Sequence, residues 1–244
     1  MRVEHNEMLY QLSFMPSLFP VNCYLVEEEK ELTLIDAALP YSDKMILQTA
    51  KQIGKPITRI VLTHAHEDHV GALDRLKEAL PNAEVFISSR DAKILRGDVS
   101  LEPTEPQVKI RGGVPKKIRT TPNQMIVDGM QVGSLQAVAA PGHTPGSMAF
   151  FDTRTHALVA GDAFQTRGGV AVAGTLKSFF PFPAMATWHK ETALESARKL
   201  SRLNPSLLAV GHGRMLKDPA YAIKKAITEA EQAIERRGND EARN

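Results

Sequence analysis

Cysteine is almost absent from this chain of 244 residues, and long apolar runs are missing altogether. The single cysteine, Cys23, excludes an intramolecular disulfide, which is typical of proteins in a reducing compartment. No apolar stretch approaches the roughly 18 residues of a membrane span. The first residues include acidic side chains where a signal peptide is apolar. We therefore expect a cytoplasmic protein that has no membrane partner.

Neither sign of charge is in excess. The 30 basic and 28 acidic residues leave a formal net charge of +2, which argues against an extended surface for nucleic acid. The composition, 43% hydrophobic and 24% charged, is that of an ordinary globular protein. The length is ample for a buried core. We therefore expect a globular chain without a nucleic-acid partner.

Short apolar runs alternate with segments of helical periodicity along the chain. The stretches Val21–Asp36, Ile57–Thr63 and Ala83–Ser88 predict strands, the first of them a hairpin. Residues 42–54 and 70–80 have the apolar spacing of helices. This alternation predicts a layered α/β fold.

One order of elements occurs twice. From Val21 to His64 the sequence predicts a hairpin, a helix and a strand followed by a histidine. The same order is predicted from Ser147 to His212. Two similar halves that face each other would bring their strand ends to one shared edge. Chance recurrence in an α/β protein is the competing interpretation.

The stretch VLTHAHEDHVGAL places three histidines and an aspartate within six positions. In an extended segment alternate side chains share one side, so His64, His66 and Asp68 would point the same way, with His69 turned to a neighbouring position. Imidazole and carboxylate suit Zn²⁺, Mn²⁺ or Fe. Four candidate ligands are too many for one short segment to wrap around a single ion. The stretch therefore predicts two metal ions, and an ordinary polar loop is the alternative.

Three further candidate ligands follow apolar strands. His143 lies in APGHTPGS, Asp162 in VAGDAF and His212 in AVGHGR. The glycines that flank His212 remove side-chain bulk and permit tight turns, so a ligand there can reach a crowded site. Each short motif is weak alone, but their fixed order with the histidine cluster is specific.

The ordered set HAHEDH, PGHTPGS, GD and GHG resembles that of the metallo-β-lactamase-fold hydrolases. The resemblance implies an α/β fold of the four-layer αββα sandwich type, in a single domain that we expect to span residues 1–244. It also implies two divalent metal ions at one edge. Zn²⁺ is the expected metal, and Mn²⁺ or Fe are the alternatives. The ligands it assigns to the first ion are His64, His66 and His143. Those of the second ion are Asp68, His69 and His212, and Asp162 would bridge the two ions.

One position departs from the family pattern. The family often has Asp-Thr-Gly or Asp-Ser-Gly after the second strand of the early hairpin, whereas this chain has Asp36-Ala37-Ala38. Because of this departure, the family's usual hydrogen bonding and turn shape are not assumed at this position. It does not affect the seven ligands.

The site and the resemblance predict a metal-dependent hydrolase that acts on a small-molecule ester, lactone or thioester. Two ions that share a water lower its pKa and give a hydroxide nucleophile near neutral pH. Asp68 is placed to take the proton of this nucleophile, and we predict it as the catalytic residue. Three alternatives stay open: a glyoxalase II-like thioesterase, a mononuclear-iron enzyme similar to persulfide dioxygenases, and a metal-binding scaffold without turnover.

Two irregular segments flank these motifs. Residues 97–124 contain the basic stretch VKIRGGVPKKIRTT, for which a solvated loop is the simpler interpretation and an anion site the alternative. Residues 164–189 are aromatic, and Phe179, Phe180 and Phe182 are candidate substrate contacts. A homodimer interface is an equal alternative for these aromatic residues.

Overall fold

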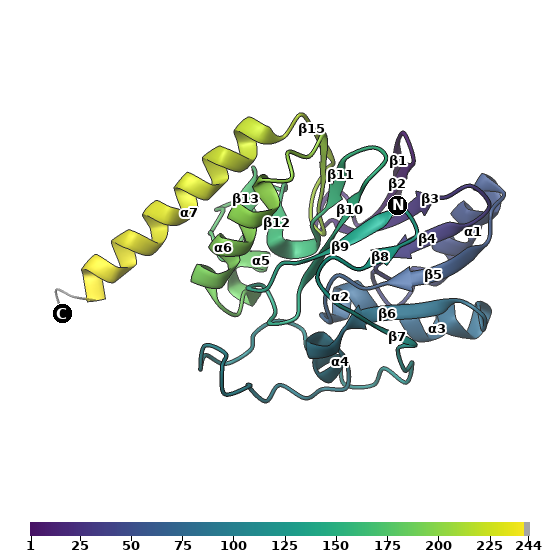
Figure 1. Cartoon of the computed structure of the whole chain (residues 1–244), viewed down its shortest axis with the longest axis horizontal. Helices are drawn as coiled ribbons and strands as arrows, with labels where there is room; N and C mark the ends of the chain where they lie inside the picture. Colours follow the sequence, from purple (N-terminus) through teal and green to yellow (C-terminus); the bar gives the residue numbers. More distant parts are fainter. Residues whose placement is uncertain (242–244) are drawn as a thin grey trace.

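Two β-sheets form the middle of the molecule, and helices lie on either side of them (Figure 1). The computed structural model describes residues 1–241, so the last three residues of the expected domain lie outside the described residues. The first sheet has seven strands in chain order: β1 (Arg2–Asn6), β2 (Leu9–Phe14), β3 (Val21–Glu27), β4 (Leu32–Ile35), β5 (Ile57–Val61), β6 (Glu84–Ser88) and β7 (Gln124–Ile126).

The second sheet has six strands in the order β15-β14-β11-β10-β9-β8. Their bounds are β8 (Gln131–Val132), β9 (Leu135–Ala139), β10 (Met148–Asp152), β11 (Ala157–Val159), β14 (Leu207–Ala209) and β15 (Leu216–Lys217). A short 3-10 helix, η1 (Gly161–Ala163), follows β11, and the strands β12 (Phe164–Gln165) and β13 (Ala171–Val172) form a separate hairpin.

The helices belong to the two outer layers and to the loops. They are α1 (Asp43–Ile53), α2 (Glu67–Val70), α3 (Leu73–Ala79), α4 (Ser89–Leu95), α5 (Phe182–Ala186), α6 (Lys190–Ser201) and α7 (Ala220–Glu241). Figure 1 shows α1 and α3 beyond the first sheet and α6 and α7 beyond the second. Among residues 1–241, no helix has both the length and the apolar character that a membrane span requires.

Three apolar clusters separate four layers. One cluster joins α1 and α3 to the first sheet, a second lies between the two sheets, and the third joins the second sheet to α6 and α7. In β4, Leu34 faces the first cluster and its neighbour Ile35 faces the second, as the alternation of side chains along a strand requires. A strand buried on both faces is continuously apolar. The arrangement confirms the predicted four-layer αββα sandwich.

The predicted repetition is also present. In the first half the β3–β4 hairpin is followed by α1 and by β5, which pairs with β4 in parallel. In the second half the β10–β11 hairpin is followed by α6 and by β14, which pairs with β11 in parallel. Each parallel strand ends just before predicted ligands, His64 in one half and His212 in the other.

The helix predicted over residues 70–80 is present as α3, but it begins only at Leu73, because α2 ends at Val70 and the two helices are separated there. Gly71 lies against the chain that follows β4, and a Cβ at this position would lie 2.7 Å from the Ala38 carbonyl oxygen. The Gly71 N–H donates to the same oxygen at 2.8 Å. This contact between distant segments interrupts the helix, and the apolar periodicity carries no sign of it.

Candidate metal centre

All seven predicted ligands lie at one edge of the sandwich, where strands of both sheets end. Two follow β5, two lie in α2, and the others follow β9, β11 and β14. The side chains are buried except that of Asp68, which is 28% exposed. The ligand atoms form three overlapping groups, and within each group they lie within 4.8 Å of one another: His64, His66 and His143; His64, His69 and Asp162; Asp68, His69 and His212. The structure therefore brings together the whole predicted set, whose role as ligands remains a prediction.

The histidine cluster changes conformation partway along its length. His66 is extended, with φ −77° and ψ 150°, and α2 begins at Glu67. The backbone N–H groups of His69 and Val70 both donate to the His66 carbonyl. The expectation of an extended segment through Asp68 is therefore wrong, and Asp68 and His69 reach the cluster from a helical turn.

Asp162 lies between the two predicted groups of ligands. One carboxylate oxygen is 3.2 Å from His143 Nε2 and 3.2 Å from His212 Nε2. The other is 3.5 Å from His69 Nε2. This position fits a carboxylate that bridges two ions.

Three of the histidines bind a protein acceptor with the ring nitrogen that faces away from the cluster. His66 Nε2 donates to the Arg111 carbonyl at 2.9 Å, and His212 Nδ1 donates to the Pro20 carbonyl at 2.7 Å. His69 Nδ1 lies 2.8 Å from an Asp36 carboxylate oxygen. Because a carbonyl only accepts, the proton of His66 and of His212 is fixed on the outer nitrogen. Such bonds leave the inner nitrogen with its lone pair directed inward, as metal ligation requires.

Several inner atoms have no hydrogen-bond partner in the described part of the chain. They are buried, and leaving them unpaired costs free energy. These atoms are His64 Nε2, His69 Nε2 and Asp162 Oδ1. A cation held among them would satisfy all three, so the residues present fit a metal site.

Burial and neighbouring charges together shift the pKa values of the cluster. It lowers the pKa of His143 to about 3 despite the nearby Asp162 carboxylate. Burial and the neighbouring imidazoles also hold the pKa of His64 well below its ordinary value. Burial alone would raise the pKa of Asp162, but His212 and His69 outweigh this effect and hold the pKa well below its usual range. At His69 and His212 burial alone would lower the pKa, but nearby carboxylates, Asp162 foremost, outweigh it and raise the pKa. Because neutral imidazole and ionised carboxylate are the forms that bind a metal, a cation bound there would displace any proton on the inner nitrogen of these two histidines.

Two buried aspartates fix the loops that carry the ligands. Asp36 accepts hydrogen bonds from the Thr63 N–H and hydroxyl at 2.8 and 2.7 Å, besides its contact with His69. The departure at Asp36-Ala37-Ala38 therefore leaves these bonds intact. Asp91 accepts from the N–H groups of Ala65 and Gly146, both at 2.8 Å, and so joins the loop of His64 to that of His143. Asp91 was not predicted as a site residue, although Ser88 before it is typical of a helix start.

The hairpin formed by β2 and β3, called the N-terminal hairpin below, holds the loop of His212. Tyr24 Oη donates to the Val210 carbonyl at 2.6 Å, and Asn22 Nδ2 donates to the carbonyls of Val210 and Gly213, both at 2.8 Å. Gln11 Nε2 adds a bond of 3.0 Å to Gly213. Side chains of the first sheet thus position a ligand that follows the second sheet.

Two glycines make room for the cluster. A Cβ at Gly211 would lie 2.1 Å from Asp162 Oδ1 and 2.7 Å from a carbon of the His69 ring. This contact explains the glycine before His212. Gly112, in the irregular segment, has φ +93°, and a Cβ there would lie 2.3 Å from His66 Nε2.

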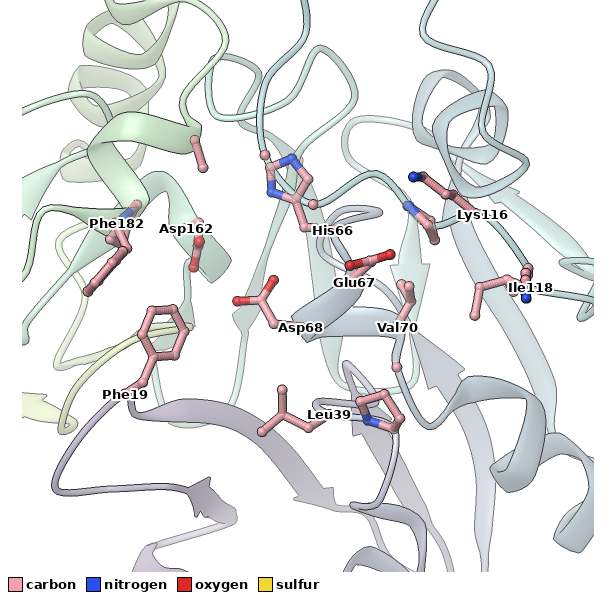
Figure 2. A pocket seen from close by; sticks show the side chains of 18 of the residues that line it. Phe19, Leu39, His66, Glu67, Asp68, Val70, Lys116, Ile118, Asp162 and Phe182 are labelled. Atoms are coloured by element: carbon pink, nitrogen blue, oxygen red, sulfur yellow. The ribbon is translucent and has the colours of Figure 1, made fainter.

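A pocket of about 1020 Å³ opens beside the cluster. His66, Asp68 and Asp162 lie on its wall together with Phe19 and Phe182 (Figure 2). Phe19 is a site residue that the sequence analysis missed, because it stands in a short loop without a motif.

The three predicted aromatic contacts have different positions. Phe182 lines the pocket and is 51% exposed. Phe180 is buried, with its ring 5.1 Å from that of Phe19 and 5.6 Å from that of His212. Phe179 is 90% exposed and does not line the pocket. Phe180 therefore supports the wall, and Phe179 faces solvent.

The basic stretch VKIRGGVPKKIRTT is a largely exposed loop, and part of it also lines the pocket. Its residues 112–113 and 115–119 line the pocket. The Arg111 carbonyl binds His66, and the Gly113 carbonyl accepts the Glu67 N–H at 2.7 Å. The segment therefore forms one wall of the candidate site.

Comparison with known proteins agrees with this geometry. The model of the metallo-beta-lactamase superfamily matches residues 16–212, and the chain belongs to this superfamily. The uncharacterized protein YobT of Bacillus subtilis (strain 168) is 56% identical over 232 residues, which are 95% of this chain and 100% of YobT. The probable metallo-hydrolase YflN of the same strain is 34% identical, over 79% of this chain and 80% of YflN. The solved structure of TTHA1623 in a di-iron-bound form is 26% identical and has a TM-score of 0.61, over 87% of this chain and 96% of that one.

Proposed function

We propose that this protein is a metal-dependent hydrolase that cleaves an ester, a lactone or a thioester at a pair of divalent metal ions. The observation that carries the proposal is the convergence of seven imidazole and carboxylate groups in three overlapping clusters. Two ions bound there would lower the pKa of a water molecule and polarise the substrate carbonyl. The inward lone pairs of His66 and His212 support this assignment.

Asp68 is the residue to which we assign proton transfer. It is the most exposed member of the cluster and lines the pocket, and Figure 2 shows its carboxylate directed into the middle of the pocket. A carboxylate at this position can take a proton from the nucleophile and deliver it to the leaving group. Glu67 is the competing base, but Figure 2 shows it turned toward the side of Lys116.

The apolar part of the pocket favours a substrate with an apolar portion. Phe19, Leu39 and Phe182 line the side of the pocket near Asp68 (Figure 2). Small-molecule pockets are mostly apolar with a few polar groups that fix orientation. A lactonase-like or esterase activity on an acyl-bearing substrate is therefore the finer form of the proposal.

The imidazole and carboxylate ligands suit Zn²⁺, Mn²⁺ and Fe alike. The di-iron form of TTHA1623 supports iron as a candidate besides zinc. We also infer a cytoplasmic location, which the single buried cysteine supports.

The number of bound ions tests the proposal. Protein prepared without chelator and supplied with Zn²⁺, Mn²⁺ or Fe²⁺ is expected to hold two ions per chain by elemental analysis. It is expected to hydrolyse at least one compound in a panel of lactones, esters and thioesters. His212→Ala is expected to lose most of this turnover, because it removes a ligand of the second ion. The control His5→Ala, an exposed histidine outside the cluster, keeps both ions and turnover.

Two results would contradict the proposal in different ways. A firm limit of one ion per chain would favour the mononuclear persulfide dioxygenase-like alternative. Two ions with no turnover on any compound of the panel would favour a metal-binding scaffold.

A further inference from the structure

The pocket wall opposite the aromatic residues carries positive charge. Lys116 and Lys117 both line the pocket. Figure 2 shows Lys116 on one side and Phe19 and Phe182 on the other, with Asp68 between them. A molecule bound over Asp68 would therefore meet an apolar wall in one direction and cations in the other.

The backbone on both sides of these lysines is anchored. Before them, the Gly113 carbonyl accepts the Glu67 N–H at 2.7 Å. After them, the N–H groups of Arg119 and Thr120 donate to the Asp74 carboxylate at 2.8 to 3.1 Å. The lysines therefore extend from a short piece of backbone that is fixed at the pocket rim.

The charges of the two lysines are not neutralised by the protein. Arg119, two residues beyond, pairs with Glu78 at 2.6 Å and with Asp74 at 3.5 Å. By contrast, no described carboxylate lies within the 4.0 Å of an ion pair from either lysine ammonium. Two carboxylates outside the ligand set line the same pocket: Glu67 pairs with neither lysine, and Asp74 pairs with Arg119. Unpaired cations beside an apolar wall attract and hold an anion.

We propose that Lys116 and Lys117 bind a negatively charged group of the substrate, while Phe19 and Phe182 hold an apolar portion. The inference rests on the proposed function in identifying the bound molecule as the substrate. It narrows the substrate class to amphiphilic esters, lactones or thioesters that carry an anionic group away from the bond that is cleaved.

A pair of fluorescent dyes tests the anion site without any need for turnover. The anionic dye 8-anilinonaphthalene-1-sulfonate and the neutral dye N-phenyl-1-naphthylamine share the same aromatic body and differ in the sulfonate. The metal-loaded protein is titrated with each dye, and the Kd is read from the fluorescence increase. The wild type is expected to bind the anionic dye more tightly than the neutral one, and added salt is expected to reduce the difference.

Matched lysine variants identify the cations responsible. In the double variant Lys116→Gln/Lys117→Gln, the Kd of the anionic dye is expected to rise roughly fivefold to tenfold, the effect of losing two solvent-exposed charge contacts. The Kd of the neutral dye is expected to stay within roughly twofold. The control Lys224→Gln/Lys225→Gln removes another exposed lysine pair, on α7, and is expected to change neither dye.

Two further variants separate the walls of the pocket. Phe182→Ala is expected to weaken both dyes alike, since it removes apolar contact only. Glu67→Gln is expected to tighten the anionic dye alone, since it removes an opposing charge.

Several outcomes would overturn the anion site. One is a Kd for the anionic dye that does not change in Lys116→Gln/Lys117→Gln. Another is a rise in the Kd of the neutral dye as large as that of the anionic dye in this variant. The third is a wild type that does not bind the anionic dye more tightly than the neutral one. The proposed function fails separately: if the dyes behave as expected but no compound of the panel is hydrolysed, the anion site stands and the hydrolase assignment falls.

Discussion

Single atoms decide whether each histidine of the cluster can act as a ligand. The Arg111 carbonyl holds the proton of His66 on Nε2, and the Pro20 carbonyl holds that of His212 on Nδ1. In both cases the acceptor is backbone, so its position depends on the course of the chain and not on a side chain. Loss of such an outer contact weakens metal binding about tenfold to a hundredfold.

Gly112→Ala tests the contact behind His66. The added Cβ would lie 2.3 Å from His66 Nε2 at a backbone φ of +93°, so either the ring or the segment must move. We expect the affinity for one of the two metal ions to fall roughly tenfold to a hundredfold, measured by competition with a chelator. The control is Gly129→Ala, where φ is +82° and nothing lies within 4 Å.

The control separates the effect of backbone strain from that of the steric clash between the new Cβ and His66. Both variants are expected to lose about 1–2 kcal/mol of unfolding free energy, because both place a side chain in the left-handed region. Only the Gly112 variant is expected to lose metal affinity. Equal metal affinity in the two variants would contradict the assigned role of the Arg111–Gly112 backbone.

Residue type and order predicted the seven members of the cluster, because few side chains bind these metals and their spacing after strands is specific. The residues that the sequence analysis missed act through three-dimensional contact. Phe19 reaches the pocket from a short loop, and Asp91 joins two ligand loops from α4. Among the aromatic candidates, packing against Phe19 and His212 buries Phe180 and leaves Phe179 in solvent. Composition alone cannot distinguish these positions.

At the level of elements, α3 anchors the basic segment that forms one pocket wall. Asp74 in this helix accepts bonds from the Thr120 hydroxyl at 2.6 Å and from the N–H groups of Thr120 and Arg119. Burial alone would raise the pKa of Asp74, but these hydrogen bonds outweigh it and lower the pKa. The carboxylate is therefore favoured in the folded state.

Asp74→Asn is expected to reduce the loss of stability in acid. The folded pKa of Asp74 lies below the unfolded value of about 4, so the unfolded chain takes up the proton first as the pH falls. The stability that Asp74 contributes is complete above this value and is lost as the pH falls through the lowered folded pKa. Urea unfolding at neutral pH and at about pH 3.5 measures the difference between wild type and variant.

The control for this prediction is Glu84→Gln, which removes an exposed carboxylate of β6. It is expected to follow the wild type at both pH values. If Asp74→Asn shows the same acid loss as the wild type, then the ionised carboxylate does not stabilise this anchor.

Periodicity predicted most elements because burial on one face selects apolar residues at regular spacing. The helix that begins after Ser42 ends at Gly54, whose φ of +83° suits glycine, as its sequence indicated. The break between α2 and α3 could not be predicted, because it depends on a contact with the chain after β4. Helix α4 was missed because its seven residues are too few for a periodic pattern.

Across the whole molecule, the candidate centre lies where the two halves meet, beside the bonds from Asn22 and Tyr24 to Val210. Its ligands follow β5 in the first sheet and β9, β11 and β14 in the second. A ligand that binds only the folded state stabilises that state by mass action. Metal ions at this edge would therefore tie the two sheets together.

Metal removal is expected to lower the Tm. At a metal concentration a hundred times the Kd, binding contributes about 2.7 kcal/mol, and each 1 kcal/mol shifts the Tm by about 2–4 °C at this chain length. Chelation should therefore lower the Tm by roughly 5–10 °C, measured by differential scanning calorimetry. His212→Ala is expected to show a smaller drop, since it already lacks a ligand of one ion. A Tm that does not respond to chelator would mean that no metal stabilises the fold.

The bonds from Tyr24, Asn22 and Gln11 to the loop of His212 also set an order of assembly during synthesis. The N-terminal hairpin leaves the ribosome early, whereas the loop that it positions leaves among the last parts of the sandwich. Domains generally fold as units as the chain emerges, and here the hairpin must wait for its partner. The chain therefore cannot complete the predicted centre until His212 and Gly213 have emerged, although the His64–His69 cluster, His143 and Asp162 are synthesised before them.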